Sequence, residues 1–540
     1  MSAVQPGFSG APTLICDPPL AQWPAVVAKN QAQAEGWSFA IAGVPAPVLR
    51  GRARRRLLAL AGLKADPERP LLVTGHQPVF YHPGIWIKAF AVTGQARRLG
   101  GAAINVTVDQ DTGELAAEVP GRVGQQLHYG KEYLLPSQAG RPLETMAPPP
   151  SAQVDDFAAR VRERLATLDW PEGLEYWDRF ADGLGAAARE ADSAAALGVA
   201  SRRAYERAWG EELCPDVPIS RISQTPEFLL FFVHWAVEAA PLREAFNRAL
   251  AEFRAAHRVR SAAVPFPDLL VRPDGAVELP FWAITPAGIR RKLYVRRRGG
   301  DLEISHLEGT VARIPAAGGE GAVEALVAAG VQVRPKAVPL TVFHRLFVAD
   351  LFVHGTGGAR YDQVTDALLA DYFGITPPRF ATVSASLYLP LGERPVPASA
   401  VRAQRRKLRD LVFNPQRFAW EIPEPDDGLV ELVRRKEALI AAMHQPGAPK
   451  RQLTREIEAV NDGLYRALAP VVARAEGELK RLEARARSAA VAFRRTYPFF
   501  FFNPARLWEL LAASTGAAAP EGGGPAGALH EAGGSAQAAP

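Results

Sequence analysis

The stretch LLVTGHQPVFYHPGIWIKAF, residues 71–90, contains three patterns in a row. Its first residues form a short apolar run ahead of a turn, which is typical of a buried strand, and apolar residues then recur every three or four positions from residue 84 to residue 99, which predicts a helix. The next run, GGAAINVTVDQD, is rich in small and β-branched residues and indicates a second strand. This strand–helix–strand unit predicts a parallel sheet that is covered on both faces.

Composition narrows the class of protein. The chain has 540 residues, of which 48% are hydrophobic and 22% are charged, so we expect a globular protein of about three domain-sized units. A net charge of +6 is small for this length and permits an anionic ligand. The arginines are scattered and are not interleaved with aromatic residues, so we expect no nucleic-acid partner.

Cysteine content and apolar runs predict a cytoplasmic protein. Cys16 and Cys214 are the only cysteines, which is too few for a disulfide framework and fits a reducing compartment. The most apolar run, LLFFVHWAV, is far shorter than the roughly 18 residues that a membrane helix needs. The first residues lack a basic segment ahead of an apolar core, so we expect no signal peptide and no membrane partner.

Changes of pattern along the chain divide it into five expected parts. They are the first α/β half with an N-terminal extension (1–150), a helical insertion (151–260), the second α/β half (261–398), a C-terminal helical hairpin or coiled coil (399–513) and a tail that is disordered by composition (514–540). Pro446 and Gly447 are expected to turn the hairpin, and Pro470 to kink or break its second arm.

The turn after the first strand is a candidate phosphate site. Gly75 permits a tight turn, and the helix that follows presents free N–H groups and the positive end of its dipole. His76 could donate a hydrogen bond to a phosphate or, when protonated, pair with it. The alternative is that His76 and His82 only cap the helix and satisfy loop carbonyls, which we favour for His82. Lys88, one turn into the helix, could reach a phosphate or lie at the surface.

Two aspartates close the second strand. Asp109 and Asp111 are alternate residues and would point the same way, so they could bind an amine, a ribose or a magnesium ion. The alternative is a polar strand exit, in which aspartates are common.

A glycine-rich segment, HGTGGARYD, precedes a later helix. Gly355, Gly357 and Gly358 could bring backbone N–H groups against a phosphate or a carboxylate. Their spacing fits neither the dinucleotide-binding nor the Walker pattern, and glycine turns without a ligand are common.

Three segments together resemble the bacillithiol biosynthesis cysteine-adding enzyme family: VTGHQPVFYHPGIWIKAF, INVTVDQD and RPKAVPLTVFHRLFVADLFVHGTGGARYDQVTDALLADYFGITPPRF. The resemblance implies a Rossmann-like, nucleotidylyltransferase-type core with inserted segments and a C-terminal α-helical coiled coil. It covers the two α/β halves and the C-terminal helices, and residues 150–330 show little that matches.

Matching the family motifs assigns candidate residues. The matched positions are Gly75 and Gln77 of the turn, Lys88 of the helix, Asp109 and Asp111 of the acidic motif, and Gly355, Gly357, Gly358 and Tyr361 of the later loop. The chain departs from the family pattern at His76 and Gln110, which replace a glutamine and a histidine, and the glutamate of the later loop is missing.

The resemblance implies a ligase that joins the carboxylate of cysteine to an amine of a small-molecule acceptor, with ATP or another adenine nucleotide and with magnesium. In this hypothesis His76, Gln77 and Lys88 stabilise phosphate charge, Asp109 and Asp111 orient an amine or a ribose, and one of the two acts as a base. The loop from Gly355 to Gly358 holds the second substrate. The alternatives are a nucleotidyltransferase with another substrate and a scaffold without catalysis. A homodimer through the C-terminal coiled coil is a further expectation.

Overall fold

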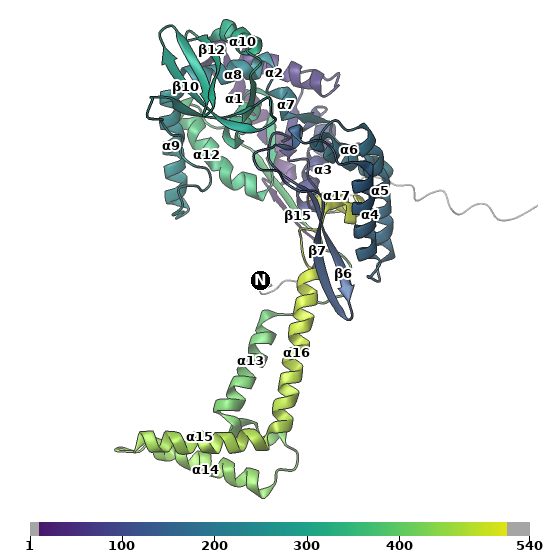
Figure 1. Cartoon of the computed structure of the whole chain (residues 1–540), viewed down its shortest axis with the longest axis vertical. Helices are drawn as coiled ribbons and strands as arrows, with labels where there is room; N and C mark the ends of the chain where they lie inside the picture. Colours follow the sequence, from purple (N-terminus) through teal and green to yellow (C-terminus); the bar gives the residue numbers. More distant parts are fainter. Residues whose placement is uncertain (1–9, 516–540) are drawn as a thin grey trace, which may run out of the picture.

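The computed structural model describes residues 10–515 and shows a mixed α/β protein. Figure 1 shows a large body that contains the sheets and a stalk of helices that extends from it. The expected tail, 514–540, lies outside the described residues from position 516 onward. Among residues 10–515 no helix has both the length and the apolar character to cross a membrane.

The body is built on a six-stranded sheet. Its strands lie in the order β1 (Thr13–Asp17), β15 (Ala381–Ser386), β14 (Leu351–His354), β4 (Leu71–His76), β5 (Ala102–Thr107) and β8 (Asp216–Pro218). All neighbours are parallel except β1, which is antiparallel to β15. The predicted strand–helix–strand unit is confirmed as β4, α3 (Pro83–Arg98) and β5.

Both faces of this sheet are covered, as the apolar strands predicted. Leu71 and Val73 of β4 belong to one core cluster, whereas Leu72 between them belongs to the other. The first cluster includes α2 (Ala46–Leu60), α8 (Pro226–Val237), α9 (Ala239–Ala256), α11 (Ala337–Phe347) and α12 (Thr356–Tyr372). The second includes α1 (Trp23–Glu35), α3, α4 (Ser151–Leu165), α5 (Pro171–Glu190) and α6 (Ala194–Ala208).

The order of the parallel strands reverses at one point. From β4 the chain adds β5 and then β8 on one side, and it later adds β14 and then β15 on the other side. The connection that follows β4 and the connection that follows β14 therefore run toward opposite edges of the sheet. In open α/β sheets a crevice forms outside the carboxyl ends of the strands at such a reversal.

The segment predicted as a helical insertion, 151–260, also supplies a strand of the main sheet. β8 follows α6 and pairs with β5, and the short α7 (Ile219–Ile222) follows it. A strand of three residues is too short to show a period of two, so the sequence pattern missed it. A hairpin of β6 (Leu115–Val123) and β7 (Gln126–Leu135) precedes these helices.

Residues 277–335, which the sequence placed in the second α/β half, form a separate antiparallel sheet. Its order is β12 (Gly309–Pro315), β11 (Asp301–His306), β10 (Arg290–Arg298), β9 (Val277–Ile284) and β13 (Gln332–Pro335), and α10 (Gly319–Ala328) packs against β12. Only β14 and β15 of that half join the main sheet. A strand pattern shows that a segment pairs, but it does not show which sheet the segment joins.

The C-terminal region consists of two pairs of helices. α13 (Ala398–Phe413) packs against α16 (Ala469–Ala492) in the stalk, and α14 (Asp427–Met443) packs against α15 (Lys450–Ala467) across its far end (Figure 1). The expected hairpin turn lies between α14 and α15, where Gly447 has a positive φ, and the chain breaks at Pro470, in the first turn of α16. The chain then returns to the body through η4 (Phe499–Phe501) and α17 (Ala505–Thr515).

A buried carboxylate joins the start of two central strands. Asp350, which directly precedes β14, accepts hydrogen bonds from Arg50 Nη2 at 2.5 Å and from Leu71 N of β4 at 2.7 Å. Arg54 Nη1 lies 3.1 Å from the same carboxylate. Its side chain is 1% exposed, so the ion pairs are shielded from water.

We expect Asp350→Ala to lower the free energy of unfolding by about 3–5 kcal/mol, because two buried guanidinium groups would lose their counter-charge. Glu320→Ala is the control. It removes the exposed ion pair between Glu320 and Arg52, which lies in α2 like Arg50 and Arg54, and the two charged groups are 3.5 Å apart. We expect this substitution to change the free energy of unfolding by at most about 1 kcal/mol. Urea denaturation followed by circular dichroism measures both. Equal effects of the two substitutions would contradict the role assigned to Asp350.

Candidate functional site

A cavity of about 500 Å³ opens at the carboxyl ends of β4, β5 and β14. Its floor is formed by the ends of these strands, and its walls by α9, α11, α12, the loop at residues 266–269 and the antiparallel sheet. The volume lies in the range of small-molecule sites. The cavity is thus located where the strand order reverses, between the two sheets.

One wall carries positive charge around an aromatic ring. Arg290 Cζ lies 4.8 Å and Lys336 Nζ 4.6 Å from the ring centroid of Trp282. Lys336 and Lys292 both donate to the buried carboxylate of Glu278, at 2.8 and 3.2 Å. Burial lowers the pKa of Lys336, and the charge of Glu278 opposes this shift.

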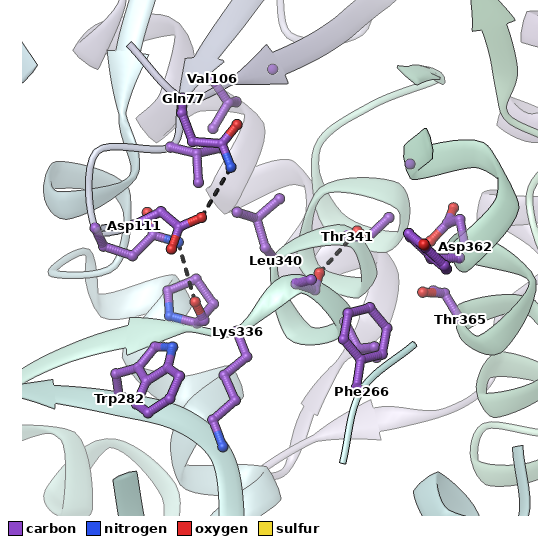
Figure 2. Close-up of a pocket in the computed structure, with 18 of the residues that line it drawn as sticks. Gln77, Val106, Asp111, Phe266, Trp282, Lys336, Leu340, Thr341, Asp362 and Thr365 are labelled. Carbon is purple, nitrogen blue, oxygen red and sulfur yellow. Dashed lines mark hydrogen bonds between the residues drawn. The ribbon is translucent and has the colours of Figure 1, made fainter. Parts of the chain in front are cut away.

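Asp111 lies against the same wall. Its carboxylate accepts hydrogen bonds from Gln77 Nε2 at 3.0 Å and from Arg290 Nη1 at 2.7 Å, and Figure 2 shows it beside Gln77 above Trp282 and Lys336. Gln110 lines the cavity beside it, donates to Pro335 O at 3.2 Å and leaves its buried Oε1 without a partner among the described residues. This cationic wall holds three positively charged side chains, those of Arg290, Lys292 and Lys336, and two carboxylates, those of Asp111 and Glu278. Its net charge is therefore positive.

The opposite side of the cavity holds a histidine–aspartate pair. His354, at the end of β14, lies with Nε2 2.9 Å from Asp362 Oδ2, and Arg345 Nη1 donates to the same oxygen at 2.7 Å. Figure 2 shows Asp362 and Thr365 across the cavity from Trp282 and Lys336, with Leu340 and Thr341 between them. Burial raises the pKa of Asp362, but the charge of Arg345 and the hydrogen bond from His354 outweigh it and lower that pKa to about 2.

The turn after β4 lines the cavity, in a different role from the predicted one. Gly75 has no positive φ; its Cβ would lie 2.6 Å from Val106 O, so glycine is required for the close approach of β5. Burial and the charge of Lys88 lower the pKa of His76 to about 3, so the imidazole is neutral at pH 7. Because Nδ1 lies 3.1 Å from Gln77 O and must donate to it, the other ring nitrogen accepts hydrogen bonds and cannot donate one to a phosphate.

The N-terminus of α3 does not face the cavity. His82 caps this helix by accepting a hydrogen bond from Gly84 N at 3.0 Å, as the alternative interpretation held. A Cβ at Gly84 would lie 2.3 Å from Ala385 O, so the backbone of β15 already occupies this place. Lys88 is buried and donates to Gly75 O at 2.6 Å. The expected phosphate site at this helix is therefore closed, and Lys88 holds the turn in place.

Asp109 and Asp111 do not share one environment. Asp109 is buried outside the cavity and accepts hydrogen bonds from the backbone and the hydroxyl of Ser220. Burial, together with the charge of Glu144, raises its pKa to about 6 although the bonds from Ser220 lower it. Only Asp111 lines the cavity, because the chain turns after β5.

Only part of the glycine-rich segment lines the cavity. Gly358 and Tyr361, in the first turns of α12, line the cavity. Gly355 caps α12, and neither Gly355 nor Gly357 is among the lining residues. A Cβ at Gly358 would lie 2.8 Å from His354 Nδ1, whereas at Gly355 or Gly357 it would meet nothing within 4 Å.

Sequence analysis missed the cationic wall and the partner of His354. Arg290 and Lys292 are alternate residues of one strand, a spacing that places both on one face and that could have marked them. His354 stands at the end of an apolar strand ahead of a glycine-rich helix start, a position typical of site residues. Nothing in the sequence indicated that Trp282 and Lys336 would meet them.

Within residues 10–515 no group of three or more histidine, cysteine, aspartate or glutamate side chains could hold a metal ion. A scan against protein-family models finds no match for this chain, and neither does a search of the curated proteins.

The shifted pKa of His76 predicts a pH dependence of stability. An unfolded imidazole titrates near 6.5 and the buried one near 3, so between these values the folded state binds fewer protons than the unfolded state. His76 therefore favours folding above pH 6.5, and this contribution is lost as the pH falls toward 3.

We expect the stability of the wild type relative to His76→Gln to fall by about 3 kcal/mol between pH 7 and pH 4, at 1.36 kcal/mol per pKa unit. Urea denaturation at several pH values measures this difference. His128→Gln, at an exposed position of β7, is the control. A pH-independent difference for His76→Gln would show that its ring is not held neutral by the fold.

Proposed function

We propose that the protein is a nucleotide-dependent ligase of the cysteine-adding type, which joins the carboxylate of an amino acid to an amine of a small-molecule acceptor. The observation that carries the proposal is the cavity at the reversal of strand order, with a cationic wall on one side and a histidine–aspartate pair on the other. Each of the three segments that resemble the cysteine-adding enzymes contributes some of its residues to this cavity.

The proposed core is Rossmann-like. Numbered in chain order, the parallel strands β8, β5, β4, β14 and β15 lie in the order 3-2-1-4-5, which is the order of doubly wound nucleotide-binding sheets. The antiparallel sheet and the helices from α4 to α9 are then insertions into this core. The paired helices α13 to α16 support the proposed coiled coil.

The cationic wall is the proposed place of the nucleotide phosphates. Arg290, Lys292 and Lys336 present guanidinium and ammonium groups, and a phosphate would add charge-assisted hydrogen bonds to them. This assignment replaces His76 and Lys88, because the N–H of His76 donates to Gln77 O and the ammonium group of Lys88 donates to Gly75 O. Magnesium would enter with the phosphates, because it commonly binds through phosphate oxygens and water.

The remainder of the cavity suits the organic part of the ligands. Phe246, Phe266 and Leu269 form an apolar side that can hold a purine ring. Asp111 and Gln77 can accept hydrogen bonds from ribose hydroxyls or from an amine, as the sequence hypothesis held for Asp111. The choice of cysteine rests on the family resemblance alone.

Two other functions use the same cavity differently. A nucleotidyltransferase with another substrate would release pyrophosphate from ATP without cysteine. A scaffold would bind no nucleotide.

We also propose that the protein forms a homodimer through its C-terminal helices. Phe413 and Trp420 on the stalk support this proposal, because their side chains are 60% and 78% exposed. Size-exclusion chromatography with light scattering of the full chain measures the oligomeric state.

We expect Lys292→Ala to weaken ATP binding at least about tenfold, because one charge-assisted contact of about 1.5–3 kcal/mol is lost. Glu278 keeps Lys336 as its partner, so the fold should survive. Arg291→Ala is the matched control: Arg291 is the neighbour on β10, pairs with the exposed Glu308 at 2.7 Å and should leave ATP binding unchanged.

The measurement is a thermal-shift titration with ATP, ADP and AMP, with and without magnesium. Ligand at a hundred times its dissociation constant adds about 2.7 kcal/mol of stability. Parallel assays of phosphate and pyrophosphate release with and without cysteine separate the ligase from the nucleotidyltransferase. No shift with any nucleotide would reject both enzymes in favour of the scaffold.

A further inference from the structure

The histidine–aspartate pair is built as a unit rather than as an isolated surface contact. The side chains of Asp362 and Arg345 are each 2% exposed, and that of His354 is 11% exposed. Arg345 also donates to Asp366 Oδ1 at 2.6 Å, and its guanidinium lies over Phe380. These contacts hold Arg345, and Arg345 in turn holds Asp362 beside His354.

The charge of Asp362 selects the tautomer of His354. A carboxylate with a pKa near 2 is ionised at neutral pH and can only accept hydrogen bonds. In the neutral form of His354 the proton therefore resides on Nε2, and Nδ1 carries a free lone pair. The structure gives Nδ1 no hydrogen-bond partner among the described residues, and His354 lines the cavity.

Gly358 keeps this lone pair accessible. A methyl group at position 358 would lie 2.8 Å from Nδ1, which is closer than real Cβ contacts allow. His354 could not move away without breaking its bond to Asp362. Gly358 itself lines the cavity, so a ligand atom can occupy the space that a side chain would fill.

We propose that His354 is the catalytic proton acceptor of the cavity, that Asp362 and Arg345 are positioning residues, and that the substrate group bound beside His354 is an amine. The inference rests on the proposed function and deepens it. It assigns the cationic wall to the phosphates and the opposite side of the cavity, where His354 can accept a hydrogen bond, to the amine.

The proposed step is amide formation. Nδ1 takes one proton from the ammonium group of the acceptor, and the freed nitrogen lone pair forms a C–N bond to the carboxyl carbon of the amino acid, which ATP has activated. The bond from that carbon to a phosphate oxygen breaks, and the phosphate leaves with the bonding electrons. The second N–H proton passes to solvent as the amide forms, and His354 later returns its proton to solvent.

The test compares His354→Gln and Gly358→Ala with the wild type. Gly185→Ala is the matched control, because this helical glycine lies in α5 and its added Cβ would meet nothing within 4 Å. Gly-to-Ala changes within helices favour the helix, so Gly358→Ala should fold. Product formation from ATP and cysteine is followed by mass spectrometry, with ethanolamine as a charged amine and with hydroxylamine, which is largely uncharged at neutral pH.

We expect His354→Gln and Gly358→Ala to lower the rate with ethanolamine at least about 100-fold, as loss of a general base does. The rate with hydroxylamine and the ATP-induced thermal shift should stay within about threefold of the wild type, a pattern that a purely structural defect would not produce. Gly185→Ala should match the wild type in all assays. Retention of the ethanolamine rate in His354→Gln, or equal losses with both amines, would overturn the proposal.

Modification by diethyl pyrocarbonate, which acylates unprotonated imidazole nitrogen, separates this proposal from the proposed function. If the wild type neither binds ATP nor forms product, the ligase function fails, and peptide mapping of the modified protein then decides on His354. Modification of His354 in the wild type and its loss in Gly358→Ala supports an open proton acceptor. An unmodified His354 in the wild type overturns it.

Discussion

The site depends on the buried carboxylate of Asp350. It binds two guanidinium groups of α2 and the first N–H of β4, and it directly precedes β14. One residue thereby ties together a helix, the strand from which the sheet grows in both directions and the strand added on its other side. Leu351 of β14 pairs with Leu72 of β4, and the carboxyl ends of both strands line the cavity.

Burial and charge then assign different chemistry to the two sides of the cavity. On one side the three positive charges of the cationic wall outnumber the two negative charges of Asp111 and Glu278. Two of the three cationic groups lie over the ring of Trp282. On the other side Arg345 and His354 Nε2 both bind the carboxylate of Asp362, which leaves Nδ1 of His354 without a hydrogen-bond partner among the described residues. An anionic group and an amine would each find a complementary side, which is the requirement for a ligase that binds both.

At the turn after β4, the groups that predicted a phosphate site make other contacts in the fold. A glycine, a histidine and a helix start suggest an anion site in any sequence, because free N–H groups and a dipole are present. Here His82 satisfies the first of these groups, the backbone of β15 fills the space, and Lys88 turns back to a carbonyl. Which groups remain free is decided by neighbours that are distant in sequence.

The sequence by itself determined the β4–α3–β5 unit, the covered faces of the sheet and the breaks at Gly447 and Pro470, because periodicity, apolar runs and proline act locally. It also marked Gly75, Asp111 and the segment around His354 as strand ends. Only the tertiary structure decided that residues 277–335 form their own sheet and bring Trp282, Arg290 and Lys292 over these strand ends. It also decided that Asp109 and Lys88 are buried and that Asp362 meets His354. These outcomes depend on which surfaces pack together, and packing between distant segments leaves no periodic pattern in a single chain.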